Sequence, residues 1–415
     1  MKNIFLHTFL IAYSLIAFTC QKNPKTIDFD TDFVISAEVI TPQALQVNVD
    51  NFARLVSVTF PSGTNISDVR IRLTLAPGVS MEEPKEKLWQ YDLTKKTTFK
   101  VRKDGQIVLF RIKPEFETIP LNLSSKGWEN KTNFGQLPLY LSVYKYDRKM
   151  NDKNVVAYIS IADMNDKLAK FTVLGEAQGL KTPNQFYDSS GKPKIVLNAG
   201  YFWDGHSLGL IVRDGKTIKP AQPMVWRNYN NVSTVYYPTQ GAFIATANAT
   251  FQAHWAYEYN GKLYVYPSPS PNKAGEKPQE IPSDKFPAGS QELVPKEAIG
   301  AGPLLIKNGE YKNLWEYEMF DAFSGVGPTT NNPRSAIGYI PSGYLVFFVC
   351  EGRNKTPNTP GLTLKEVADL LMDLGCTEAI NLDGGGSSCM LINGQETIIP
   401  SDGKQRAITS MVAMY

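Results

Sequence analysis

Histidine is scarce in this chain of 415 residues, and the scarcity excludes several kinds of catalytic centre. Of its three histidines, His7 lies in the hydrophobic first segment, which leaves His206 and His254 for chemistry. Two histidines cannot build a multi-histidine metal centre, and the sequence has no Gly-x-Ser-x-Gly motif of a serine hydrolase. His206 follows Asp204-Gly205, where a loop histidine is the plainer interpretation. Any chemistry must rely on carboxylates, arginines, amides and hydroxyls.

Cysteine is equally sparse, with four residues in the whole chain. Beyond Cys20, the spacings of Cys350, Cys376 and Cys389 match no zinc motif. Three cysteines cannot all pair with one another, and Cys350 and Cys389 lie in apolar runs. We therefore predict buried free thiols.

Strong charge is also missing. The net charge of +3 is spread along the sequence, and no basic run or basic-aromatic stripe indicates nucleic acid as a partner. No EF-hand spacing is present. A divalent cation, calcium or magnesium, nevertheless stays an open candidate, because Asp204, Glu351 and Asp383 could ligate it together with carbonyl oxygens. No cofactor follows from the sequence with certainty.

The first residues are typical of a targeting segment. Lys2 precedes an apolar run over 4–18, which is too short to span a membrane, and Cys20 follows it. This arrangement resembles a bacterial lipoprotein site, although Ala17 and Thr19 depart from its usual residues. We predict a signal peptide over 1–19, a lipidated tether over 20–31 and a location in the bacterial cell envelope, in the periplasm or at the surface. An ordinary signal peptide cut nearby is the alternative.

The rest of the chain divides into two predicted domains. Short alternating apolar runs over 32–124 predict an all-β, immunoglobulin-like sandwich that serves as a spacer or contacts glycans. Residues 125–415 predict a strand-rich α+β domain with mixed α/β character. The pairs Asp104-Gly105, Asp214-Gly215, Asn308-Gly309 and Asn393-Gly394 predict hairpin turns. The segment 266–295 is rich in Pro, Ser, Lys and Gly, and we expect it to form a loop or lid at the rim of the site.

The most informative motif is Ala379-Ile-Asn-Leu-Asp383-Gly-Gly-Gly-Ser-Ser388, an apolar run that ends in a carboxylate, three glycines and two hydroxyls. A capping box at Thr363-Leu-Lys-Glu366, apolar residues at helical spacing and Gly375 predict a helix just before it. Asp383 would then lie at a strand end, where α/β proteins often bind ligands. The alternative is a structural turn that Asp383 caps.

Four further segments combine buried runs with polar or glycine ends. They are Asn198-Ala-Gly-Tyr-Phe202, Gly302-Pro-Leu304, Arg334-Ser-Ala-Ile-Gly338 and Glu351-Gly-Arg353. With the helix and the glycine motif, their order resembles the phosphodiester glycosidase family over roughly residues 130–415. Glu351 stands where many members have Asp.

The resemblance implies hydrolysis of a sugar-1-phosphodiester, with N-acetylglucosamine-1-phosphodiester as the named candidate, to a sugar and a phosphomonoester. Glycosidic cleavage commonly uses two carboxylates, and permanently charged arginines suit an anionic phosphodiester. We expect Asp383 and Glu351 to be catalytic, and the residues that bind substrate or phosphate to be Arg334, Arg353, Asn198, Gly200, Tyr201, Gly384, Gly385, Gly386, Ser387 and Ser388. The glycine amides would form an anion-binding nest.

Structural roles remain open for most of these residues. Arg334 could form a surface ion pair, Arg353 could pair with Glu351, the two serines could satisfy turn amides, and Tyr201 could belong to the core. Two other functions also stay open. One is an envelope lipoprotein that binds anionic glycans without catalysis, and the other is a phosphodiesterase that cleaves the P–O bond.

Overall fold

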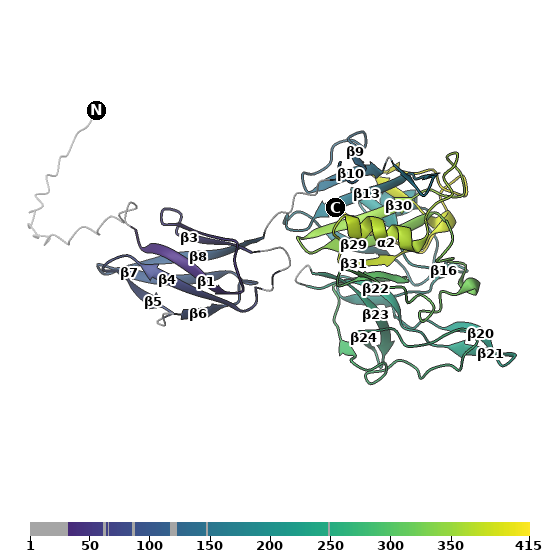
Figure 1. Ribbon diagram of the computed structural model, residues 1–415, viewed down its shortest axis with the longest axis horizontal. Coiled ribbons are helices and arrows are strands. Elements are labelled where there is room, and N and C mark those ends of the chain that lie inside the picture. The colour runs from purple at the N-terminus through teal and green to yellow at the C-terminus, as the bar shows by residue number, and fades with distance from the viewer. Residues whose placement is uncertain are drawn as a thin grey trace, which may run out of the picture. The chain divides into compact units, whose positions relative to one another are not determined.

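The computed structural model describes residues 32–415, apart from 61–63, 65, 85–87, 117–122, 147 and 248–249. The predicted signal peptide and Cys20 lie outside the described residues. The chain divides into two units at Glu117/Thr118, near the predicted boundary at residue 124. Figure 1 shows both units, with some of their strands labelled.

The N-terminal unit consists of two β-sheets around one core. Buried side chains from both sheets, among them Phe60, Ile71 and Phe110, meet in this core. The parallel pairing of β3 with β8 is combined with antiparallel neighbours. The immunoglobulin-like topology stays a prediction. One sheet contains β1 (Val34–Thr41), β4 (Val69–Leu75) and β6 (Leu88–Tyr91); the other contains β2 (Gln46–Asp50), β3 (Leu55–Phe60), β8 (Gln106–Phe116), β7 (Thr97–Lys103) and β5 (Ser80–Glu83).

The C-terminal unit is built on three larger sheets. The eight-stranded sheet has the order β28 (Glu310–Tyr311), β27 (Leu304–Lys307), β31 (Glu378–Asn381), β29 (Arg334–Ile340), β30 (Tyr344–Cys350), β13 (Ala157–Asp163), β10 (Leu141–Tyr146) and β9 (Trp128–Asn130). The seven-stranded sheet has the order β19 (Lys216–Lys219), β18 (Ile211–Arg213), β26 (Glu297–Gly300), β22 (Gln240–Ala245), β23 (Phe251–Tyr259), β24 (Lys262–Tyr266) and β25 (Gln291–Glu292).

The five-stranded sheet and three ribbons complete this unit. The sheet has the order β14 (Phe171–Gly175), β34 (Ser410–Met414), β15 (Ile195–Asn198), β32 (Met390–Ile392) and β33 (Gln395–Glu396). The ribbons pair β11 (Lys149–Met150) with β12 (Lys153–Asn154), β16 (Phe202–Trp203) with β17 (His206–Ser207), and β20 (Val225–Tyr229) with β21 (Val232–Tyr236).

Helix content is lower than the predicted α+β class implies. The described residues contain two α-helices, α1 (Pro183–Ser189) and α2 (Leu364–Asp373), and two 3-10 turns, η1 (Ala322–Ser324) and η2 (Gly385–Ser387). The strands around β31 pair antiparallel, so Asp383 does not lie at the end of a parallel α/β sheet. The unit is mostly β.

Helix α2 begins and ends where the sequence predicts. The Thr363 side chain accepts the Glu366 N–H while the Glu366 side chain accepts the Thr363 N–H, which forms the capping box. Gly375 has a φ of +97°, a conformation that suits glycine after a helix. Val367 and Leu371 bury the apolar face of the helix against the eight-stranded sheet.

The predicted hairpin turns are also present. Asp104-Gly105, Asp214-Gly215 and Asn308-Gly309 connect paired strands, as does Asn393-Gly394, and both residues of each turn have a positive φ. Such turns follow the right-handed twist of the strands that they join, which favours Asn-Gly and Asp-Gly sequences.

The segment 266–295 does not cover the site. None of its residues lines the large pocket described below, so the predicted position at the rim is wrong. The segment instead packs on its own unit through the Tyr236 hydroxyl, which donates to Glu276 O, and through a buried network of Ser270, Thr239 and Asn272.

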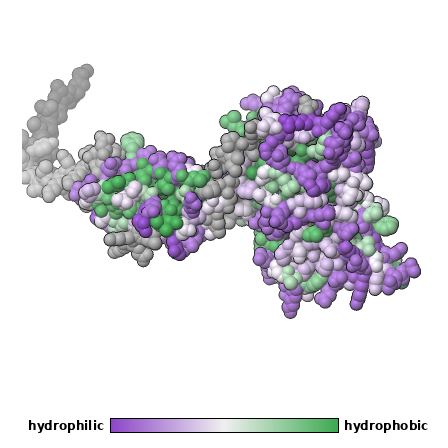
Figure 2. All heavy atoms as spheres, in the orientation of Figure 1, coloured by the Kyte–Doolittle hydropathy of each residue, from purple (hydrophilic) through white to green (hydrophobic). Residues whose placement is uncertain are grey.

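The two units differ in the surface that Figure 2 presents. Hydrophobic residues are grouped on the visible face of the N-terminal unit, whereas hydrophilic residues cover most of the C-terminal unit in the same view. Exposed apolar side chains of the N-terminal unit include Phe52, Ile107 and Leu109. Among the described residues, no helix has the length and apolar character needed to cross a membrane.

Candidate active site

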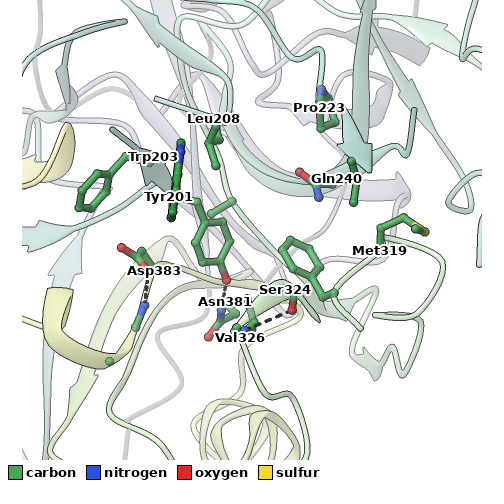
Figure 3. A pocket seen from close by; sticks show the side chains of 18 of the residues that line it. Tyr201, Trp203, Leu208, Pro223, Gln240, Met319, Ser324, Val326, Asn381 and Asp383 are labelled. Carbon is green, nitrogen blue, oxygen red and sulfur yellow. Dashed lines mark hydrogen bonds between the residues drawn. The ribbon is translucent and has the colours of Figure 1, made fainter. Parts of the chain in front are cut away.

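A pocket of about 850 Å³ opens in the C-terminal unit. Seven of the predicted site residues line it: Tyr201, Arg334, Arg353, Asp383 and the glycines at 384, 385 and 386. In Figure 3, Asp383 and Asn381 lie together at one end, while Pro223, Gln240 and Met319 lie at the other. The pocket therefore has a polar end near Asp383 and a second, more apolar end.

The backbone around Asp383 is fixed from three sides. After β31 ends, Leu382 N donates to Ser335 O and Asp383 N donates to Ala199 O. The Asn198 side-chain amide donates to Asp383 O at 2.5 Å. These bonds join β31 to its neighbours in two different sheets and hold the carboxylate at the pocket.

Burial dominates the electrostatics of this carboxylate. Desolvation raises the pKa of Asp383 to about 6, although hydrogen bonds from Ser387 and Gly384 and the charge of Arg406 oppose the shift. The Gly384 N–H donates to Oδ1 at 2.9 Å and fixes the orientation of the carboxyl group. At neutral pH Asp383 is mostly ionised, yet it can take up a proton at little cost, as a general base requires.

Asn198 is a scaffold residue. Its side chain is fully buried, and its oxygen accepts from Ser335 Oγ at 2.6 Å and from Cys389 N at 3.0 Å. One N–H of its amide donates to Asp383 O, and the whole side chain is buried beneath the pocket surface. Asn198 positions Asp383, and it does not line the pocket.

Asn381 is a pocket residue that the sequence reasoning did not single out. Its amide nitrogen donates to Tyr201 Oη at 2.9 Å, Gly302 O at 3.0 Å and Leu382 O at 2.7 Å. Its oxygen is buried and has no partner among the described residues. An unpaired buried acceptor beside Asp383 is suited to a hydroxyl or amide N–H of a ligand.

The ring of Tyr201 lines the pocket, and its hydroxyl is held by a backbone carbonyl. The hydroxyl donates to Gly302 O at 2.6 Å, and the ring lies 5.5 Å from that of Phe320. Burial, reinforced by the charge of Asp383, raises the pKa of this phenol well above its usual range. Tyr201 therefore contributes a neutral aromatic surface to the pocket.

Arg334 is buried to an unusual degree, with 2% of its surface exposed. The guanidinium donates four hydrogen bonds to backbone carbonyls, at distances of 2.6–2.9 Å, on Leu362, Val326, Gly327 and Thr330. One of its five N–H groups is left. Arg334 therefore secures the loop over 326–330, and one N–H group is left for its predicted role in binding substrate or phosphate.

Two other arginines present their charges at the polar end. Asp402 accepts from Arg353 at 3.2 Å and from Arg406 at 2.6 Å, so that one carboxylate orients both guanidinium groups. Arg406 also donates to Ser387 Oγ at 3.4 Å. The sequence does not identify Arg406 and Asp402 as site residues, because they lie in a turn without a recognisable motif.

The glycine run is explained by close packing with these arginines. A Cβ on Gly386 would lie 2.0 Å from Arg406 Nη2 and 2.1 Å from Asp402 Oδ2, and one on Gly385 would lie 2.9 Å from Arg353 Nη2. Gly385 also has a φ of +58°. Only residues without a side chain let both arginines lie this close to the backbone.

The predicted nest of three amides is not formed. Gly384 N donates to Asp383 Oδ1 and Gly385 N donates to Pro333 O, so two of the three N–H groups are used within the protein. The Gly386 N–H has no acceptor among the described residues. Any anion at this end must be held mainly by arginine side chains.

Contrary to the prediction, Glu351 does not lie with Asp383. One of its carboxylate oxygens accepts the Ile399 N–H at 3.0 Å, and the residue lines a separate pocket beside Tyr158 and Thr397. The chain turns Glu351 under the 397–400 loop and away from the large pocket. The carboxylates that line the large pocket are Asp383 and, at its exposed edge, Asp204.

The remaining predicted residues support the site from behind. Gly200 lies against Gly300 O and donates its N–H to Ser410 Oγ, while Ser387 and Ser388 are buried behind the glycine run. None of the three lines the pocket.

The three carboxylates considered as metal ligands do not come together. Within the described ranges, no three Asp, Glu, His or Cys side chains come together as metal ligands would. Asp204 and Asp383 share the pocket, but Glu351 is elsewhere. Cys350, Cys376 and Cys389 are buried free thiols, as predicted.

The chain is similar to known proteins over part of its length. The phosphodiester glycosidase family matches residues 191–415, which is more than half of the chain. N-acetylglucosamine-1-phosphodiester alpha-N-acetylglucosaminidase of Homo sapiens is 41% identical over 69 residues, 17% of this chain and 13% of the human protein. The SPbeta prophage-derived uncharacterized protein YomE of Bacillus subtilis is 35% identical over 83 residues, 20% of this chain and 13% of that protein.

Among solved structures, the catalytic domain of the zebrafish N-acetylglucosamine-1-phosphodiester alpha-N-acetylglucosaminidase, auto-inhibited by its pro-peptide, superimposes with a TM-score of 0.46 and 19% identity. The superposition covers 69% of this chain and 87% of the zebrafish domain. A hypothetical protein from Synechocystis gives a TM-score of 0.46 at 15% identity, over 85% of this chain and 74% of that chain.

The site combines a partly buried carboxylate at the end of β31 with two arginines that share the carboxylate of Asp402. From the match over residues 191–415, the chain belongs to the phosphodiester glycosidase family.

Proposed function

We propose that this protein hydrolyses a glycosyl phosphodiester and releases a sugar and a phosphomonoester. The observation that carries the proposal is Asp383, a partly buried carboxylate with a pKa of about 6 that lies beside two arginines in the large pocket. N-acetylglucosamine is the candidate sugar because it appears in the name of the human relative.

The arginine pair supports binding of the phosphodiester. Arg353 and Arg406 share one carboxylate, Asp402, so the three groups together carry a net charge of +1 at the polar end. Guanidinium groups bind phosphate oxygens through charge-assisted hydrogen bonds, often two at once. Asp402 orders both side chains before substrate arrives, which lowers the entropy cost of binding.

The chemistry assigned to Asp383 needs no strong acid. Water forms a bond to the anomeric carbon while the bond from that carbon to the phosphate oxygen breaks, and the electron pair leaves with phosphate. The proton of the water passes to Asp383, whose negative charge also stabilises the oxocarbenium-like transition state. Phosphate is a better leaving group than an alkoxide, so a second carboxylate is not essential.

The direct test is hydrolysis of N-acetylglucosamine-1-phosphate methyl ester by the purified full-length chain, with and without EDTA. The proposal predicts equal amounts of N-acetylglucosamine and methyl phosphate. Binding of the ester without product, in buffers with and without added calcium or magnesium, would favour the glycan-binding alternative. Loss of activity in EDTA alone would assign a divalent cation to the reaction.

We also propose that the protein is lipid-anchored in a bacterial cell envelope. The support is the sequence around Cys20, where an apolar segment too short to span a membrane is followed at once by cysteine. Replacement Cys20→Ser is expected to move the protein from the membrane fraction to the soluble fraction. An unchanged membrane fraction in that variant would contradict lipid attachment.

A further inference from the structure

Three separate segments expose a large apolar side chain at the same pocket. Trp203 comes from the β16–β17 ribbon, Met224 precedes β20, and Phe323 lies in the 3-10 turn η1. Their exposed fractions are 77%, 56% and 83%. Trp203 lies on the Asp383 side of the pocket (Figure 3), so we call Met224 and Phe323 the apolar wall. Exposed apolar side chains that gather on one surface, rather than scatter singly, commonly mark a binding site.

Phe323 is held in its exposed position by a built arrangement. Asp321 accepts the Phe323 N–H at 3.1 Å and caps the turn. The same carboxylate accepts two hydrogen bonds from Arg227, each at 2.7 Å, and the Arg227 guanidinium lies 5.8 Å from the centre of the Phe323 ring. The ion pair is largely buried and ties β20 to the turn. The protein thus orders a phenyl ring that it does not bury.

At the end of the pocket away from Asp383, most polar side chains already form hydrogen bonds or ion pairs within the protein. Gln240 donates to Glu318 O at 3.1 Å, Gln222 donates to Glu258 O at 3.3 Å, and Arg227 is paired with Asp321. Lys219 and Ser324 are further donors here; the Lys219 ammonium donates to Pro220 O at 3.5 Å and the Ser324 hydroxyl to Asp321 O at 2.7 Å. A second sugar would need several donors and acceptors for its hydroxyls, whereas a hydrocarbon chain needs only apolar surface.

The size of the pocket allows for a group beyond the phosphate. Its volume of about 850 Å³ lies near the top of the range of roughly 300–1,000 Å³ typical of sites for drug-sized ligands. A sugar and a phosphate at the polar end leave the other end unfilled. Met319 and Phe320 are buried beneath that end and continue the apolar surface inward.

We propose that the apolar wall binds the group on the far side of the phosphate and that this group is a hydrocarbon chain. The substrate class is then an alkyl- or polyprenyl-type glycosyl phosphodiester. The identity of the sugar-phosphate part rests on the proposed function, but the apolar subsite can be tested without turnover.

The first experiment measures binding of octyl phosphate and methyl phosphate to the full-length chain by isothermal titration calorimetry, below the concentration at which octyl phosphate forms micelles. Octyl phosphate is expected to bind about tenfold tighter or more, because its extra methylene groups leave water. Phe323→Ser and Met224→Ser should each weaken octyl phosphate about fivefold or more and leave methyl phosphate unchanged.

A matched control separates this subsite from general surface hydrophobicity. Val294 is 77% exposed in the same unit and does not line the pocket, so Val294→Ser should leave octyl phosphate binding unchanged. Equal affinity of the two phosphates, or an equal loss in the Val294 variant, would overturn the proposal. Circular dichroism checks that the variants fold. Because the replaced side chains are exposed, we expect the variants to fold.

The second experiment separates the two proposals. The octyl and methyl esters of N-acetylglucosamine-1-phosphate are compared as substrates, with the octyl ester expected to have a kcat/KM about tenfold higher or more. Equal hydrolysis of both esters, unaffected by Phe323→Ser, would overturn the hydrocarbon subsite and keep the proposed function. If octyl phosphate binding depends on Phe323 but neither ester is hydrolysed, the hydrocarbon subsite is kept and the proposed function is overturned.

Discussion

Asp383, Arg353 and Arg406 form the surface of the polar end, whereas Asn198 and Arg334 form a layer directly beneath or beside it. Asn198 ends β15, Arg334 begins β29 and Asp383 follows β31. Both groups contain residues suited to a phosphorylated sugar. They differ in where their hydrogen bonds go. Asn198 and Arg334 use most of their groups on backbone and neighbouring side chains, while the arginines of the surface share one carboxylate. A polar residue at a strand end is thus as often a clamp as a ligand.

The largest effect should separate Asp383 from every other polar residue. Asp383→Asn keeps an oxygen for the Gly384 N–H but loses the charge and the proton acceptor. We expect kcat to fall by about 10³-fold, within the roughly 10²–10⁴-fold contribution of a general base. Steady-state kinetics on the methyl ester, with Asp204→Asn as a matched carboxylate control, measures this. An equal loss of kcat in the two variants would contradict a distinct catalytic role for Asp383.

The second effect concerns stability and identifies the clamp. Arg334→Leu should lower the free energy of unfolding by about 3–5 kcal/mol, because four buried carbonyls lose their donor. Arg353→Leu should cost less than about 1 kcal/mol, since its ion pair is largely exposed. Urea unfolding of both variants makes the comparison, and similar midpoints would show that Arg334 is not a clamp.

A third, smaller effect assigns the phosphate end. Arg406→Ala should raise KM for the methyl ester about tenfold with a smaller change in kcat, because a charge-assisted hydrogen bond to substrate contributes roughly 1.5–3 kcal/mol. Arg213→Ala removes another surface arginine that pairs with a carboxylate, Glu176, away from the pocket. An unchanged KM in the Arg406 variant would leave the phosphate to other residues.

The smallest effect is on the pH dependence of stability. Because the pKa of Asp383 is about 6 in the folded protein and lower in the unfolded chain, the folded state binds more protons between these values. Stability contributed by Asp383 therefore falls as pH rises from about 4 to 6. Asp383→Asn should be more stable than wild type by about 1–3 kcal/mol at pH 7, with the gap closing near pH 4. A constant gap in urea unfolding across this range would contradict the raised pKa.

Local signals in the sequence predicted local features well. The capping box placed α2, the Asn-Gly and Asp-Gly pairs placed hairpins, and the glycine run located Asp383. Each of these signals depends on a few neighbouring residues whose backbone chemistry is the same in any fold.

The features that sequence reasoning missed depend on tertiary contacts. Arg334 is a clamp because carbonyls of the preceding loop over 326–330 and of Leu362 surround it, and Glu351 faces another pocket because the 397–400 loop covers it. Arg406 lies in a turn with no motif. Nothing in the sequence around Phe323 indicates whether its ring is exposed or buried.

The measurement closest to the central claim is hydrolysis of N-acetylglucosamine-1-phosphate methyl ester in water enriched in oxygen-18, followed by mass spectrometry of both products. Attack at the anomeric carbon predicts label in the sugar and none in methyl phosphate. Label in methyl phosphate would show P–O cleavage and would contradict the role that we assign to Asp383 at the sugar.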